Sequence, residues 1–224
     1  MTRSVKWALV LPDGVPTSAG LPLVVFLHGQ GETGERLEAL LPALSGAPFA
    51  RLFIDGPWPV EVRGEAPPRI GASWYSYVGD DPVFRQDLLL RASWLETLVR
   101  HAAAGAPIDL ASVGVFGYSQ GGYLASVAAL RHRAFWKALC VTSSRIKSEM
   151  LGDELHNLAQ YPVLVIHGRA DKAVSCERQL ESADRLRAHG ANVACEIHEG
   201  GHGIRRTAGP LVVDFFTRWL TPRE

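Results

Sequence analysis

The 224-residue chain is predicted to be an α/β protein, with a mostly parallel sheet of about seven strands and helices on both faces. Short apolar runs alternate along the chain with longer amphipathic segments, a pattern typical of βαβ units. The most uniform of these runs is uncharged and rich in valine, like strands that are buried on both faces. Hydrophobic residues make up 47% of the chain and charged residues 21%, which is enough apolar surface for a packed core.

Seven segments are expected to form the strands. The run Leu21–Leu27 (LPLVVFL) is the clearest, because it is apolar over its whole length. The others, in chain order, are Val5–Leu11, Arg51–Ile54, Ser112–Phe116, Trp136–Thr142, Pro162–Ile166 and Val193–His198.

Four segments between or after these strands have helical patterns. The longest has leucines at helix spacing, and the third stops at a glycine in the usual C-terminal position. The last begins with proline, which suits the first turn of a helix. The four are Phe84–Ala104, Gln120–Leu130, Cys176–His189 and Pro210–Leu220.

The main irregular segment is Gly56–Pro82, which is rich in proline and glycine. A loop this long in a compact domain is usually functional or disordered. Its aromatic residues, among them Trp58, Trp74 and Tyr75, favour an ordered loop packed on the body of the protein. It is therefore not a linker, and residues 1–224 are expected to form a single domain.

Composition excludes several classes of function. The chain has 23 basic and 23 acidic residues, and proteins that bind DNA or RNA usually carry a basic surplus. Its three cysteines form no CxxC motif or disulfide framework, so a reducing compartment is expected. No apolar run approaches the roughly 18 residues of a membrane span. Trp7–Leu11 is too short for the core of a signal peptide, and a cytoplasmic location is expected.

The strongest chemical signal is GYSQGG at residues 117–122, which matches the G-x-S-x-G nucleophile elbow. That motif needs a serine on a sharp turn between a strand and a helix, with small residues on either side. Ser119 follows the apolar run SVGVF and precedes a small-residue helical segment, which is the required context. The alternative is a glycine-rich turn that happens to contain a serine.

A serine hydroxyl is a poor nucleophile unless a base, itself oriented by an acid, takes its proton. Where a serine lies on such an elbow, the acid and then the histidine follow it in the chain. Asp171 is the expected acid, in the loop after Pro162–Ile166. His202 is the expected base, in the glycine-rich loop after the last strand, with His198 as the fallback.

Two backbone N–H groups are expected to form an oxyanion hole, which binds the negative charge that develops during acyl transfer. One belongs to Gln120, directly after the serine, and the other to Gln30, in the glycine turn after Leu21–Leu27. No metal or cofactor is expected. His198 and His202 are four residues apart, but the glycines around them argue against a helix that would present both to a metal. His28 and His167 each end a strand and are expected to line or support the site.

The segments FLHGQGETG, GYSQGG, HGRADKAV and GGHGI follow one another in this order. Together they resemble the phospholipase/carboxylesterase family of the α/β-hydrolase fold, which includes small serine carboxylesterases and acyl-protein thioesterases. The resemblance covers nearly the whole chain. It implies a triad of Ser119, Asp171 and His202, with an oxyanion hole formed by the backbones of Gln30 and Gln120. Departures such as Glu32, Ser76 and Ser175 put the substrate in doubt and leave this chemistry intact.

The expected function is therefore a serine esterase acting on short- to medium-chain monoesters, as a monomer or homodimer with a small-molecule substrate. An acyl-thioesterase or lysophospholipase with the same triad is the alternative, and a non-catalytic binding protein is a remote one. The segment Ser143–Tyr161 is too short for a lid domain, so an open or shallow pocket is expected, with Trp58, Trp74 and Tyr75 on one side. Zero net charge suggests a substrate that needs no electrostatic steering.

Overall fold

The central element of the computed structural model, which describes residues 5–14, 20–63, 67–77 and 81–221, is a seven-stranded sheet. Its strands are β1 (Trp7–Val10), β2 (Leu21–Leu27), β3 (Ala50–Ile54), β6 (Ile108–Tyr118), β7 (Trp136–Thr142), β8 (Pro162–Gly168) and β9 (Asn192–His198). Their order is β1-β3-β2-β6-β7-β8-β9, and all neighbours run parallel except β1 and β3. The predicted mostly parallel sheet is confirmed.

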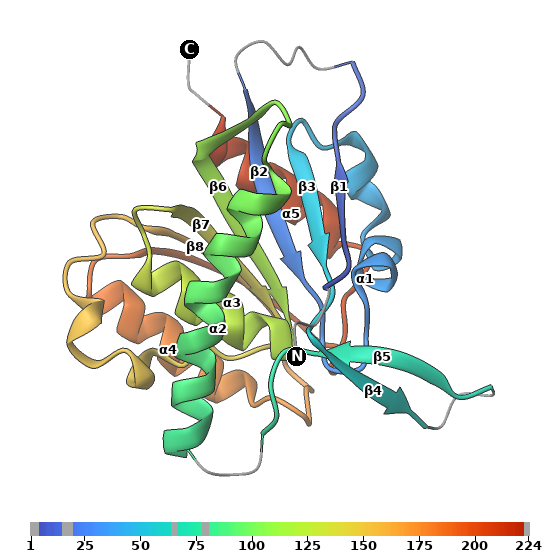
Figure 1. Cartoon of the computed structure of the whole chain (residues 1–224). Coiled ribbons are helices and arrows are strands. Elements are labelled where there is room, and N and C mark those ends of the chain that lie inside the picture. The colour runs from blue at the N-terminus through green and yellow to red at the C-terminus, as the bar shows by residue number, and fades with distance from the viewer. Residues whose placement is uncertain (1–4, 15–19, 64–66, 78–80, 222–224) are drawn as a thin grey trace.

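Helices cover both faces of this sheet, as Figure 1 shows. Strand β2 explains why: Leu23, Val25 and Leu27 face one apolar cluster, while Val24 and Phe26 face another. The first cluster packs against α2 (Asp81–Ala102), α3 (Gln120–Arg131) and α4 (Cys176–Ala188). The second packs against α1 (Gly34–Leu40), the short 3-10 helix Pro42–Gly46 and α5 (Ala208–Leu220).

A two-stranded hairpin occupies part of the segment that the sequence indicated to be irregular. Strands β4 (Trp58–Val62) and β5 (Arg69–Ser73) pair with each other, apart from the main sheet, and extend from the body of the protein (Figure 1). The base of the hairpin is fixed to the loop after β2, because Gly31 N–H donates to Ala72 O at 2.8 Å and Ala72 N–H donates to Glu32 O at 2.9 Å. The hairpin therefore supports the loop that carries Gln30.

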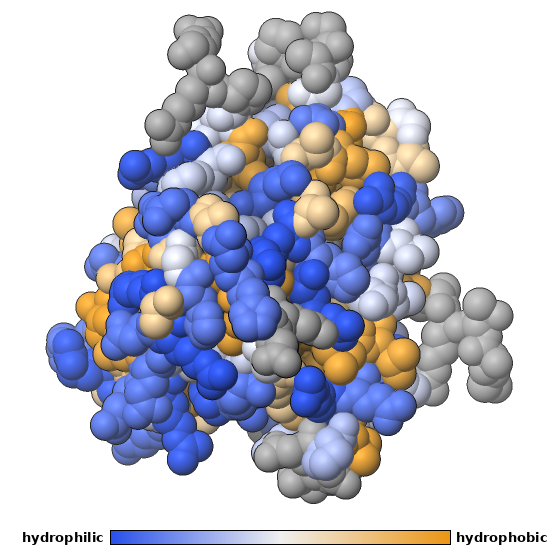
Figure 2. Space-filling model, turned by 90° about the vertical axis from the view of Figure 1, so that its left-hand side faces the viewer, coloured by the Kyte–Doolittle hydropathy of each residue, from blue (hydrophilic) through white to orange (hydrophobic). Residues whose placement is uncertain are grey.

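The chain between β7 and β8 forms no separate lid. It contains two short 3-10 helices, Ser148–Met150 and Gly152–Leu155. The apolar side chains of this segment, including Ile146, Leu151 and Leu158, are buried in the first core cluster. On the face seen in Figure 2, hydrophilic residues predominate and apolar residues form small groups between them. Within the described residues, no helix has the length and apolar character needed to cross a membrane.

Candidate active site

Ser119 lies on a sharp turn between β6 and α3. Its backbone has φ 49° and ψ −116°, a conformation that residues other than glycine rarely adopt. The turn is held from both sides, because Ser119 N–H donates to Thr142 O at 3.0 Å and Ser144 Oγ donates to Ser119 O at 2.8 Å. Neighbouring residues thus hold the strained backbone of Ser119 in place, and this fixes the position of its hydroxyl.

Three glycines make this turn possible, and each is required by a close contact. A Cβ on Gly117 would lie 2.5 Å from Gly122 Cα. A Cβ on Gly121 would lie 2.3 Å from Leu27 O, and one on Gly122 would lie 2.4 Å from Ser144 Cβ. Carbon atoms cannot approach this closely, so the turn excludes every side chain at these positions.

His202 stands between Ser119 and Asp171. Its Nε2 is 3.0 Å from Ser119 Oγ, and its Nδ1 is 2.8 Å from Asp171 Oδ2. Since an ionised carboxylate only accepts hydrogen bonds, Nδ1 carries the proton and Nε2 presents its lone pair to the serine hydroxyl. The arrangement is therefore able to take a proton from Ser119.

Asp171 is suited to orient this imidazole. Its side chain is fully buried, and its Oδ1 accepts hydrogen bonds from the N–H groups of Ala173 (2.8 Å) and Val174 (2.9 Å). Burial acts to raise the pKa of the Asp171 carboxyl, but hydrogen bonds from Val174, His202 and Ala173 outweigh it and lower the pKa below its usual value. The carboxylate is therefore ionised at neutral pH.

His198, the alternative base, lies outside this chain of hydrogen bonds. Its Nδ1 accepts from Gly200 N–H at 3.1 Å, so it shapes the turn that leads to His202. Ser143 also holds this loop, since its hydroxyl donates to Gly203 O at 3.0 Å and accepts from Gly203 N–H at 3.2 Å. Sequence reasoning did not identify Ser143, because nothing in its neighbourhood along the chain indicates this contact.

The other two strand-end histidines support the surrounding loops. His28 is fully buried; its Nε2 accepts from Gly56 N–H at 2.9 Å, and its Nδ1–H donates to Gly29 O at 2.6 Å. Burial lowers the pKa of His28, so the ring is neutral. His167 Nε2 is 3.0 Å from Val174 O, in the loop that carries Asp171.

Gln30 and Gln120 line the same cavity as Ser119 and His202. Gln120 is the first residue of α3, so its N–H has no acceptor within the helix. Its side chain has a further role that the sequence did not indicate: Oε1 accepts from Trp74 N–H at 3.0 Å, and Nε2 donates to Tyr75 O at 2.9 Å. The elbow is thereby tied to the chain that follows β5.

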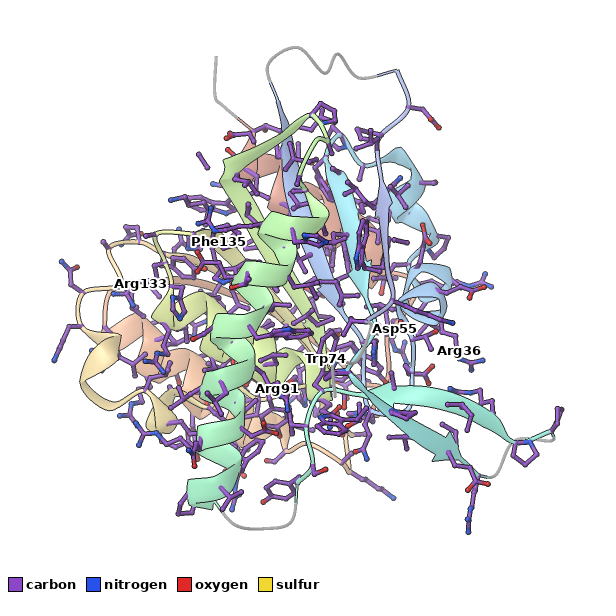
Figure 3. All side chains as sticks on the ribbon, in the orientation of Figure 1. Arg36, Asp55, Trp74, Arg91, Arg133 and Phe135 are labelled. Atoms are coloured by element: carbon purple, nitrogen blue, oxygen red, sulfur yellow. The ribbon has the colours of Figure 1, made fainter. Side chains whose placement is uncertain are left out.

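The cavity has a volume of about 610 Å³. Of the three aromatic residues expected on its wall, Tyr75 lines it, while Trp58 and Trp74 do not. Trp74 is fully buried beside α2, with its Nε1–H donating to His28 O at 2.8 Å (Figure 3). Trp58 lies on the hairpin, 5.5 Å below the Arg91 guanidinium. The expectation was wrong for both tryptophans, because Trp58 lies on the hairpin and Trp74 is buried in the core.

Two groups of side chains form most of the remaining lining, together with residues 173–175. We call the first the aromatic wall; it comprises Tyr75, Tyr77, Phe84 and Tyr123. We call the second the cationic wall; it comprises Arg145, Lys147, Lys172 and Arg178. The even charge balance of the whole chain gave no indication of this local concentration of positive charge.

Comparisons with known proteins agree with this fold. The family model described as Phospholipase/Carboxylesterase matches residues 15–219. The chain is similar in structure to the Bacillus cereus carboxylesterase (TM-score 0.76, 20% identity, 96% of this chain and 94% of that one). It is also similar to esterase PE8 (TM-score 0.76, 22% identity, 96% of this chain and 99% of that one). A third similar structure is Zea mays acyl-protein thioesterase 2 (TM-score 0.72, 20% identity, 96% of this chain and 99% of that one). The chain therefore belongs to the phospholipase/carboxylesterase family of the α/β-hydrolase fold and is a carboxylic ester hydrolase.

Proposed function

We propose that this enzyme cleaves short- to medium-chain carboxylic monoesters through an acyl-enzyme formed on Ser119. The observation that carries the proposal is the continuous chain of hydrogen bonds from Ser119 Oγ through His202 to Asp171, at 3.0 Å and 2.8 Å. In this chain a nucleophile, a base and an orienting acid stand in the order that acyl transfer requires.

In the first half of the reaction, His202 Nε2 takes the hydroxyl proton while Ser119 Oγ attacks the acyl carbon. The carbonyl oxygen becomes an oxyanion and accepts hydrogen bonds from the backbone N–H groups of Gln30 and Gln120. The tetrahedral intermediate then expels the alcohol oxygen, which receives the proton held by His202. The acyl group is now esterified to Ser119.

In the second half, water replaces the alcohol. His202 takes a proton from the water as its oxygen attacks the acyl carbon of the acyl-enzyme. The intermediate collapses by breaking the bond to Ser119 Oγ, which recovers its proton from His202. Asp171 stays ionised throughout and stabilises the imidazolium each time it forms.

Thioester hydrolysis by the same residues is a second candidate, supported by the likeness to an acyl-protein thioesterase of Zea mays. A thiolate leaves more readily than an alkoxide, so the same residues serve both reactions. A panel of para-nitrophenyl esters and acyl-thioesters of increasing chain length discriminates between the two by comparing kcat/KM for matched acyl groups.

The nucleophile is tested with a fluorophosphonate probe, which phosphonylates an activated serine. We expect the wild-type protein to be labelled and Ser119→Ala to remain unlabelled, with both variants equally folded by circular dichroism. Equal labelling of the two proteins would falsify the assignment of Ser119, and absence of labelling in both would favour a non-catalytic binding protein.

A further inference from the structure

We infer that the natural substrates of this enzyme carry a carboxylate or phosphate group, which binds to the cationic wall of the cavity. The inference rests on the proposed function, because the cavity is the one that contains Ser119 and His202. It names a substrate class that zero net charge did not suggest.

The charge of the cavity lining is strongly unbalanced. Among the described residues that line it, four are cationic and none is a carboxylate. Glu149, just outside, compensates part of this charge, since it lies 2.7 Å from Arg145 and 4.0 Å from Lys147. In the part of the chain that the structure describes, no ion pair joins Lys172 or Arg178 to an acidic group. Two cations of the wall therefore remain available to a ligand.

Arg178 lies where an anionic ligand is favoured. It lies in the first turn of α4, where the N-cap hydroxyl of Ser175 accepts from its backbone N–H at 3.2 Å. A helix N-terminus carries partial positive charge, so a cation in the first turn is unfavourable and an anion is favourable there. Glu177 in the same turn offsets part of this charge on the helix itself. An anionic ligand in the cavity would interact favourably with Arg178, Lys172 and the helix end together.

The aromatic wall of the cavity is suited to the apolar part of such a substrate. The rings of Tyr77 and Tyr123 lie 5.1 Å and 6.5 Å from Phe84, in edge-on arrangements. The two walls meet where Lys147 Nζ lies 5.4 Å from the centre of the Phe84 ring. The residues of the aromatic wall lie in α2, in α3 and in the segment that follows β5. The residues of the cationic wall lie in α4 and in the loops that follow β7 and β8. A molecule with an apolar and an anionic end therefore contacts both.

A matched series of substrates tests the inference. Its members are the butyrate esters of para-hydroxybenzoate, of para-hydroxyphenyl phosphate and of the neutral para-hydroxybenzamide, which share one acyl group. Binding of each intact ester to Ser119→Ala is measured by isothermal titration calorimetry. We expect at least one anionic ester to bind about tenfold more tightly than the amide, as charge-assisted hydrogen bonds allow. The stronger of the two anions identifies carboxylate or phosphate as the preferred group.

Variants of the wall make the test specific. Adding Lys172→Gln and Arg178→Gln to Ser119→Ala is expected to reduce the preference for the anion to less than about threefold. Adding Arg185→Gln, which removes an exposed cation from the other end of α4, should preserve the preference. Equal binding of anionic and neutral esters, or a preference that survives the double substitution, would overturn the inference.

Turnover by the wild-type protein separates this result from the proposed function. If the neutral ester is hydrolysed through Ser119 while no anion is preferred, only the inference about the cationic wall fails. If the anion binds selectively to the wall but no ester in the series is hydrolysed, the binding site stands and the proposed catalytic role of Ser119 fails.

Discussion

The elbow around Ser119 and the walls of the cavity are built in opposite ways. At the elbow, neighbouring atoms are so close that a single methyl group on Gly117, Gly121 or Gly122 has no room. In the cationic wall, the long side chains of Lys172 and Arg178 are exposed and reach the cavity from the loop after β8 and from the first turn of α4. The reacting groups are therefore held by close packing, whereas these exposed cations can change without disturbing that packing.

The largest effect is expected from breaking the chain of hydrogen bonds from Ser119 through His202 to Asp171. His202→Ala removes the only base hydrogen-bonded to Ser119 within the described residues, and we expect kcat to fall by about 10⁴- to 10⁶-fold. His198→Ala, the matched control, should lose less than about tenfold, because His198 contacts the turn and not the serine. Steady-state hydrolysis of para-nitrophenyl butyrate measures both, and the reverse ranking would transfer the role of base to His198.

The next effect tests whether packing holds the elbow. Gly121→Ala brings a Cβ to within 2.3 Å of Leu27 O, at the end of β2 and just before the loop of Gln30. We expect kcat to fall about 100-fold, since small displacements of reacting groups have effects of this size. The free energy of unfolding should fall by about 1–3 kcal/mol because the added methyl group overpacks the turn. Gly46→Ala is the control, because a Cβ there meets nothing within 4 Å. Unchanged kcat and melting temperature in Gly121→Ala would show that the elbow is not tightly held.

A smaller effect is expected where the elbow and the wall meet. Gln120→Ala removes side-chain hydrogen bonds to Ser73, Trp74 and Tyr75 and leaves buried groups without partners. We expect about a tenfold loss in kcat/KM and about 1–3 kcal/mol of stability. The exposed residue Gln86 on α2 provides the control variant Gln86→Ala. Urea denaturation and kinetics are measured together; a Gln120→Ala protein with wild-type stability would contradict a structural link.

The smallest effect concerns acid stability. The native-state pKa of Asp171 lies below its usual value, so the unfolded chain binds more protons near and below pH 4 and native stability falls as pH falls through that range. This contribution is present above the unfolded-state pKa and is lost on acidification. Asp171→Asn should therefore show a shallower loss of unfolding free energy below about pH 4 than the wild type. Identical pH dependence of the two proteins in denaturant titrations would contradict it.

These two regions also differ in how far the sequence predicts them. The meeting of Ser119, Asp171 and His202 could be predicted, because the carboxyl ends of parallel strands lie at one edge of a sheet and each residue follows such a strand. The glycines of the elbow could be predicted because they belong to the short G-x-S-x-G motif, although the contacts that require Gly121 and Gly122 are with distant residues of β2 and the loop after β7. Both signals are local or follow directly from the topology.

The cavity walls and the hairpin could not be predicted in the same way. Arg145 and Arg178 come together only through the packing of the loop after β7 against the start of α4, and neither has a distinctive neighbourhood in the sequence. Pro59 and Gly71 interrupt the strand patterns of β4 and β5, and β5 packs so closely on a distant loop that a Cβ on Gly71 would lie 1.8 Å from Gly31 O. Trp74 is an aromatic residue of the kind that often lines pockets, but its hydrogen bond to His28 O holds it in the core.

The most direct test of the account is to detect the acyl-enzyme. Intact-protein mass spectrometry on a sample quenched during turnover of para-nitrophenyl butyrate, followed by peptide mapping, locates any acyl group that the protein carries. We expect one butyryl group on Ser119. Any acyl-enzyme formed by His202→Ala should accumulate further, because the water that releases the acyl group then lacks its base. An acyl group on another residue, or wild-type turnover by Ser119→Ala, would contradict it.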